Sequence, residues 1–289
     1  MKMKKSTRMF ALLAAALMLA ASLASCGTKS ASAVSSSSAA SSSSAASSSS
    51  ADGDWAYIKA KGTLVIGITD FEPMNYKDSS GKWTGFDTEF AEAVCKKLGI
   101  SAQFQEIEWD NKILELNAKS IDCVWNGMTL TNDVTSAMEC TKAYIKNAQV
   151  VVMKADKIAK YADAASMKGL SFTAESGSAG EQAIKDAGLD GKYTAVGAQS
   201  DALLEVESGS SDACVVDITM AAAMTGTGAS YTDLASGISL TSEEYGIGFR
   251  KGSDMAGKVN SLMDELTADG TLKALGDKYD LTAALATNQ

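Results

Sequence analysis

Three short segments of the chain carry residues that can hydrogen-bond a small polar ligand. Residues 126–136 read NGMTLTNDVTS, residues 175–180 read ESGSAG, and residues 69–74 read TDFEPM. Hydroxyl and backbone N–H groups beside a glycine can bind such a ligand, whereas any one segment alone could be a loop that bonds only to itself. Residues 126–136 contain no lysine or arginine. An anionic group bound there would therefore meet only neutral donors in this segment.

Each of these segments begins where a predicted strand ends. The runs TLVIGIT (63–69), IDCVW (121–125) and GLSFT (169–173) are typical of short buried strands. In open parallel sheets a ligand binds beyond the carboxyl ends of the strands. We therefore expect the three segments to form one shared cleft.

The order of the predicted elements indicates the fold class. Strands and helices alternate over residues 63–125, and the same order returns over residues 149–216. This spacing is typical of α/β units with mostly parallel strands. We expect an α/β protein with two similar lobes, the second inserted into the first.

The N-terminal residues predict export and anchoring. Four basic residues precede an apolar run over residues 10–21 that is too short to span a bilayer, as in a signal peptide over residues 1–25. Residues 23–26, LASC, resemble a bacterial lipobox in which Cys26 is lipidated; the alternative is an ordinary cleavage site beside a chance cysteine. Residues 30–51 are all Ser or Ala except Val34, so we expect residues 26–53 to form a lipidated, flexible tether.

Composition excludes several classes of function. After removal of the signal peptide, 22 Lys and Arg remain against 35 Asp and Glu, a net charge of −13 that argues against nucleic-acid binding. The chain has no histidine, so histidine-dependent catalysis and histidine metal sites are excluded. Four cysteines remain in the domain: Cys95, Cys123, Cys140 and Cys214. Their spacing does not fit a zinc motif, and we expect them to be buried thiols. We expect no metal and no cofactor.

Nine motifs between residues 62 and 280 occur in an order that resembles a known family. They are GTLVIG (62–67), PM (73–74), DSSGKWTGFD (78–87), WDNKI (109–113), IDCVWNGMTLT (121–131), GSAGE (177–181), DACVVD (212–217), YGIGFRKG (245–252) and DGTL (269–272). The chain resembles the polar amino acid-binding proteins of ABC importers, the bacterial extracellular solute-binding proteins of family 3. These have the type 2 periplasmic-binding fold.

The resemblance implies a domain arrangement. Two crossing strands, near residues 147–150 and 243–245, would join lobe 1 (54–147 plus 244–289) to lobe 2 (148–243), with the ligand held between the lobes. The expected protein is a monomer outside the cytoplasm, lipid-anchored to the cell membrane. It would deliver a small polar amino acid or related amine to a permease, and it would not be an enzyme.

The resemblance also implies which residues bind the ligand. Asp217 matches the carboxylate that pairs with the ligand's α-ammonium group; its alternative role is the N-cap of the helix that follows. Phe71 matches an aromatic residue that packs on the ligand, with a core role as the alternative. Ser178 and Ala179 lie at a helix N-terminus, where their N–H groups suit a carboxylate. The remaining expected ligand-binding residues are Asn126, Gly127, Thr129 and Trp125, and a core role is again the alternative for Trp125.

One departure from the family pattern concerns the binding of the ligand carboxylate. The family motif continues T-x-x-R, and its arginine binds the ligand carboxylate, but residues 131–134 here read TNDV. Val134 therefore replaces the cation. Arg250 is the only arginine after the signal peptide, and its place beside Lys251 and Gly252 predicts a surface turn. Either the ligand lacks a free carboxylate, or other contacts bind one.

Two other functions remain open from the sequence. Some relatives are extracellular dehydratases, and Glu72, Glu175 or Glu244 could supply the acid or base that such an enzyme needs. The protein could also be a receptor that reports its ligand to a membrane sensor. Gene neighbours encoding a permease and an ATPase would distinguish an importer from a sensor.

Overall fold

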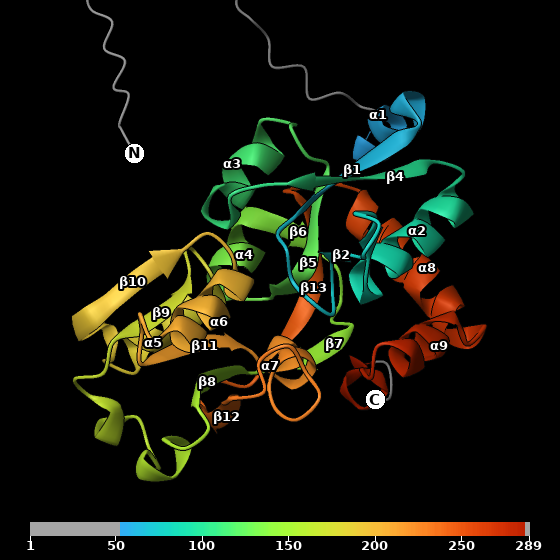
Figure 1. Ribbon diagram of the computed structural model, residues 1–289. Coiled ribbons are helices and arrows are strands. Elements are labelled where there is room, and N and C mark those ends of the chain that lie inside the picture. Colours follow the sequence, from blue (N-terminus) through green and yellow to red (C-terminus); the bar gives the residue numbers. More distant parts are fainter. Residues whose placement is uncertain (1–52, 287–289) are drawn as a thin grey trace, which may run out of the picture. The chain divides into compact units, whose positions relative to one another are not determined.

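The computed structural model describes residues 53–286 (Figure 1). These residues lie in one compact unit that comprises Ser49–Gln289. The expected signal peptide, Cys26 and nearly all of the expected tether fall outside the described residues. Among the residues described, no helix is long and apolar enough to cross a membrane.

The first sheet contains the strands from both ends of the described chain. Its order is β4 (Ser101–Glu106), β1 (Thr63–Ile68), β5 (Cys123–Thr129), β13 (Glu243–Arg250) and β6 (Met138–Cys140), and β7 (Ile145–Asn147) also pairs with β13. β1 runs parallel to β4 and β5, whereas β13 is antiparallel to its neighbours. The strands predicted at residues 63–69 and 121–125 are observed, but the first ends at Ile68 and the second begins at Cys123. However, pairing with β13 extends β5 to Thr129, so residues 126–129 belong to the strand and not to a loop after it.

Helices flank this first sheet, and α2 shows why they form. One face of α2 (Phe86–Leu98) buries Phe86, Phe90, Ala91 and Val94, the spacing of an amphipathic helix, and Gly99 ends it with φ 70°. The others are α1 (Asp54–Lys61), α3 (Lys112–Asn117), α4 (Asn132–Ala137), α8 (Met255–Ala268) and α9 (Thr271–Lys278), with 3₁₀ turns at Trp109–Asn111 and Thr282–Ala284.

The second sheet is built entirely from residues between the two ends. Its order is β10 (Tyr193–Val196), β9 (Phe172–Glu175), β11 (Ala213–Asp217), β8 (Gln149–Lys154) and β12 (Leu234–Ser239). β8 and β11 are apolar along most of their length because helices cover the sheet. These helices are α5 (Ala179–Asp186), α6 (Gln199–Ser208) and α7 (Ile218–Met224). The strand predicted at residues 169–173 begins at Phe172 and continues to Glu175. Smaller elements are the hairpin β2 (Tyr76–Lys77) and β3 (Trp83–Thr84) and the 3₁₀ turns Ile158–Lys160, Ala165–Met167 and Asp190–Lys192.

The chain passes between the two sheets twice. It leaves the first sheet after β7 and enters the second at β8, with one residue between them, and it returns between β12 and β13. Antiparallel pairing of Glu243 with Asn147 places the two passages side by side. Both sheets therefore meet at a narrow connection that carries polar residues.

The four cysteines of the domain are free thiols. Cys95, Cys123 and Cys214 are buried, and Cys140 is half-buried. Burial raises the pKa of Cys140 to about 11 and that of Cys95 to about 12, so these thiols stay protonated at neutral pH.

Candidate functional site

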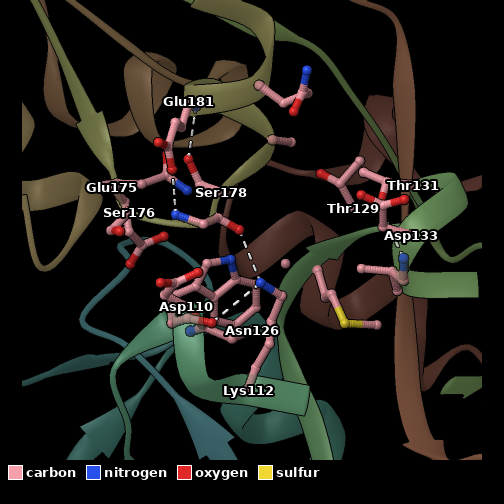
Figure 2. Close-up of a pocket in the computed structure, with 18 of the residues that line it drawn as sticks. Asp110, Lys112, Asn126, Thr129, Thr131, Asp133, Glu175, Ser176, Ser178 and Glu181 are labelled. Carbon is pink, nitrogen blue, oxygen red and sulfur yellow. Dashed lines mark hydrogen bonds between the residues drawn. The ribbon is translucent and has the colours of Figure 1, made fainter. Parts of the chain in front are cut away.

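A pocket of about 500 Å³ lies between the two sheets and is shared by both. The first sheet and its helices contribute residues within 109–113, 126–129 and 131–134. The second sheet and its helices contribute residues within 175–182, and Lys185, Gln199 and Asp217. Figure 2 shows Glu175 and Ser178 on one side of this space and Thr129 and Thr131 on the other. The three segments named from the sequence do not all take part: residues 126–134 and 175–180 line the pocket, whereas residues 69–74 do not.

Asn126, Gly127 and Thr129 line the pocket from β5. Gly127 has φ 54°, and a Cβ there would lie 2.6 Å from the Phe71 ring, so this position requires glycine. The side chain of Asn126 already bonds to the N–H and hydroxyl of Thr69, at 3.1 and 2.9 Å. The Thr129 hydroxyl donates to Glu243 at 2.9 Å. These bonds fix the wall of the pocket before any ligand is present.

Phe71 and Trp125 lie behind this wall and not in it. Phe71 is buried against Gly127 and meets the ring of Tyr245 edge-on, with centroids 6.4 Å apart. Trp125 is fully buried and packs edge-on against Phe90 at 4.8 Å. Because side chains alternate along a strand, Trp125 points into the lobe on the opposite face from its neighbours. In this structure both aromatic residues have the core role that the sequence left as the alternative.

Asp217 lies at the carboxyl end of β11, lines the pocket and is only 3% exposed. Its carboxylate accepts hydrogen bonds from the side-chain amides of Asn147, Gln149 and Gln199, and the Gln149 bond measures 2.7 Å. It does not cap α7, because its side chain makes no bond to the first turn. No lysine or arginine of the described residues forms an ion pair with it. Asp217 is therefore a buried carboxylate held only by neutral donors.

A second carboxylate, Glu243, shares the donors of Asp217. Asn147 and Gln149 donate to Glu243 Oε1 at 2.7 and 2.6 Å, so two amides bridge the two acids. Burial raises the pKa of Asp217 to about 7, and the negative charge of Glu243 adds to this effect. Two acids without a counter-charge create a site that favours a cation.

Ser178 and Ala179 line the pocket at the start of α5. The Ser178 hydroxyl accepts the N–H of Glu181 at 3.1 Å, and the Glu181 carboxylate accepts the N–H of Gly177 at 2.6 Å. This arrangement is a variant of the capping box in which the glutamate accepts the N–H of the residue before the N-cap. The Ser178 side chain is therefore occupied by helix capping, and what remains for a ligand is the N-terminal end of the helix.

Two buried charged residues of the pocket lining, Lys112 and Glu175, were not selected as ligand-binding residues from the sequence. Lys112 begins α3 and is 7% exposed; its Nζ donates to the carbonyls of Trp109 at 3.2 Å and Gly177 at 2.9 Å. Glu175 ends β9 and is 2% exposed, and its buried Oε1 accepts no hydrogen bond from the described residues. Burial raises the pKa of Glu175 to about 8. The motif WDNKI contains Lys112, but nothing in that motif shows which way its lysine points.

Val134, which replaces the family's arginine, and Arg250 lie apart in the structure. Val134 does line the pocket and is buried, and its N–H donates to the Thr131 hydroxyl at 3.2 Å. Arg250 ends β13 away from the pocket, so the predicted surface turn is wrong: it is 8% exposed. Arg250 Nε donates to Asp54 at 3.1 Å, and a second nitrogen donates to the carbonyl of Ile121 at 2.9 Å.

The sequence and fold are similar to those of known binding proteins. The chain is 31% identical over 235 residues to the L-cystine-binding protein TcyA of Bacillus subtilis (strain 168), which covers 79% of this chain and 85% of the relative. A solved ABC uptake transporter substrate-binding protein from Streptococcus pneumoniae, with bound histidine, is 26% identical and has a TM-score of 0.72, with 78% of this chain and 95% of that one covered.

A third similar protein is described as a precursor of an enzyme. The ancestral amino acid-binding protein AncCDT-1, a precursor of cyclohexadienyl dehydratase, is 29% identical with a TM-score of 0.72 and covers 78% of this chain and 99% of that one. The model of one family matches residues 64–282, nearly the whole described domain. The chain belongs to the bacterial extracellular solute-binding proteins, family 3.

Proposed function

We propose that this protein captures a small polar amino acid or related amine outside the cytoplasm and delivers it to an ABC import permease. The observation that carries the proposal is Asp217, a pocket-lining carboxylate that is buried, held by three amide donors and not paired with a cation. An ammonium group supplies the counter-charge that such a buried carboxylate lacks. The relatives named above bind L-cystine and histidine, both of which carry an α-ammonium group.

The size and lining of the pocket support this ligand class. A volume of about 500 Å³ suits a small molecule. The hydroxyl of Thr131 and the N-terminus of α5 offer neutral donors to a ligand, and the hydroxyl of Thr129, which donates to Glu243, can still accept a hydrogen bond (Figure 2). A polar ligand can thus exchange its bonds to water for bonds to the protein.

The test is a thermal-shift screen of the purified full chain. The panel contains the common L-amino acids, L-cystine, the primary amides of these compounds, and simple amines, each at millimolar concentration. A ligand that binds only the folded state raises the melting temperature by mass action, so at least one compound should raise it. If no compound in the panel changes the melting temperature, the proposed function is wrong.

A dehydratase is the second candidate, and Glu175 is the observation that favours it. A carboxyl group whose pKa is raised to about 8 lines the pocket, as a general acid would, whereas Glu72 and Glu244 do not line it. Incubating the protein with a cyclohexadienyl substrate and analysing the products by chromatography tests this. We expect no loss of water from the substrate, and measurable turnover that depends on Glu175 would establish the second candidate in place of the first.

We further propose that Cys26 carries a lipid anchor and that residues 26–53 tether the domain to the membrane. The support is the sequence LASC after the apolar run. Replacing the cysteine, Cys26→Ser, should move the protein from the membrane fraction to the soluble fraction of the producing cells. Protein that still sediments with the membranes would reject lipidation at Cys26.

A further inference from the structure

We propose that Lys112 binds the anionic group of the ligand, so that the ligand of this cleft carries a carboxylate even though Val134 stands where the family has an arginine. This inference rests on the proposed function and deepens it: the ligand class becomes amino acids with a free carboxylate, and amines without one are excluded.

The Lys112 ammonium group lies at the pocket with one N–H donor unused. Lys112 is nearly buried, yet it lines the pocket, and Figure 2 shows its side chain extending from α3 toward the turn that carries Ser178. An ammonium group has three N–H donors. Two are used by the carbonyls of Trp109 and Gly177, which leaves one for a ligand.

The charge of Lys112 is not paired with an anion in the described residues. Its acceptors in the described residues are both neutral carbonyls, and it forms no ion pair within 4.0 Å. Burial lowers its pKa, and the carboxylates of Glu175, Asp110 and Glu181 act in the opposite direction without contacting it. A buried cation is stabilised when an anion pairs with it directly. A ligand carboxylate supplies that anion.

Lys185, the other lysine of the lining, does not have these properties. Its side chain is 48% exposed and pairs with Glu181 at 2.7 Å. Solvent and Glu181 already satisfy its charge, so a ligand carboxylate gains little by binding there. Of the described lysines that line the pocket, Lys112 is therefore the one that a carboxylate would stabilise.

The bond between Lys112 and Gly177 raises a competing role. Lys112 belongs to the lobe of the first sheet and Gly177 to that of the second, so the lysine could hold the cleft shut whatever the ligand. A role in closure alone predicts an equal loss of affinity for every ligand. A role in binding the anionic group predicts a loss only for ligands that carry one.

The experiment is a cycle of one protein change and one ligand change. Isothermal titration compares wild type and Lys112→Met with L-amino acids that bind in the screen and with the matching primary amides, which keep the ammonium group but lack the carboxylate. Methionine keeps most of the apolar stem beside Trp109. The control is Lys154→Met, which removes a lysine outside the cleft that pairs with Glu207 at 2.7 Å.

We expect Lys112→Met to weaken binding of the free acids by about ten- to a hundredfold and that of the amides by less than about threefold, since charge-assisted bonds are the strong ones. Lys112→Arg should retain most of the affinity for the acids, and Lys154→Met should change neither. Equal losses for acids and amides would assign Lys112 to closure and overturn the proposal. A wild type that binds only amides or amines would also overturn it, while leaving the proposed function intact.

Discussion

Lys112 and Arg250 are both cations buried in the lobe of the first sheet, and they are satisfied in opposite ways. Arg250 is 8% exposed; it pairs with Asp54 at 3.0 Å, lies 3.6 Å from Asp122, and donates to two backbone carbonyls. Lys112 is 7% exposed and bonds only to carbonyls, one of them from the other lobe. Equal burial thus accompanies two different states of charge balance.

This difference in ion pairing distinguishes charges that stabilise the fold from charges that can bind a ligand. Acids of the same lobe neutralise Arg250, so its role is to hold α1 to the sheet at the end of β13. Asp217 and Lys112 are buried pocket-lining groups of opposite sign whose hydrogen-bond partners are neutral. A zwitterionic amino acid would neutralise both at once, which a simple amine cannot do. The partners of a buried charge, and not its burial, therefore indicate whether it belongs to the site.

The largest expected effect concerns stability and Arg250. Arg250→Met leaves Asp54 and the fully buried Asp122 with less counter-charge, which should lower the free energy of unfolding by about 3–5 kcal/mol. Chemical denaturation measures this. The control is Lys97→Met, which breaks the exposed pair with Glu265 and should cost less than about 1 kcal/mol. A loss for Arg250→Met as small as that of the control would show that Arg250 is not a structural charge.

The next effect concerns affinity and Asp217. Asp217→Asn keeps the shape of the side chain and removes its charge, so binding of an ammonium-bearing ligand should weaken by about 1.5–3 kcal/mol, one to two decades in Kd. Calorimetry measures this with the ligands of the screen. Folding should not suffer, because a buried charge without a cationic partner has been removed. Unchanged affinity combined with lower stability would place Asp217 with Arg250 as a structural charge.

The smallest effect concerns pH and Glu175. Its pKa of about 8 in the folded protein lies above the ordinary value of 4.5, so between these values the folded state holds a proton that the unfolded state has released. The resulting stability is complete below pH 4.5 and is lost as pH rises to about 8. Between pH 6 and pH 7 the wild type should lose about 1 kcal/mol more than Glu175→Gln.

Denaturation at these two pH values measures that difference. Asp87, whose pKa burial raises to about 7, contributes the same slope in both proteins. The charge of Asp217 acts on Glu175, so the comparison is made in an Asp217→Asn background, where it isolates Glu175. Parallel pH profiles for the two proteins would show that Glu175 does not hold its proton in the folded state.

The sequence by itself determined the family and the main elements. Apolar runs predicted β1 and the start of β5, because buried strands must be apolar over consecutive residues. Val134 was visible as a departure without any structure, because it interrupts a motif whose order along the chain is fixed. Asp217 could be placed at the end of a strand for the same reason: both the strand and the residue after it are local features.

Tertiary structure alone decided which side chains reach the cleft. Lys112 meets Gly177 across 65 residues of sequence, and no local pattern encodes that contact. Phe71 and Trp125 looked like ligand-facing aromatics, but the positive φ of Gly127 lets the chain cover the Phe71 ring, and strand alternation turns Trp125 inward. The sequence predicted that Arg250 is exposed, but in the structure α1 and the turn before β5 cover it. The orientation of a charged side chain and the presence of a counter-charge both depend on residues distant in sequence. These two properties decide whether the charge stabilises the fold or binds the ligand.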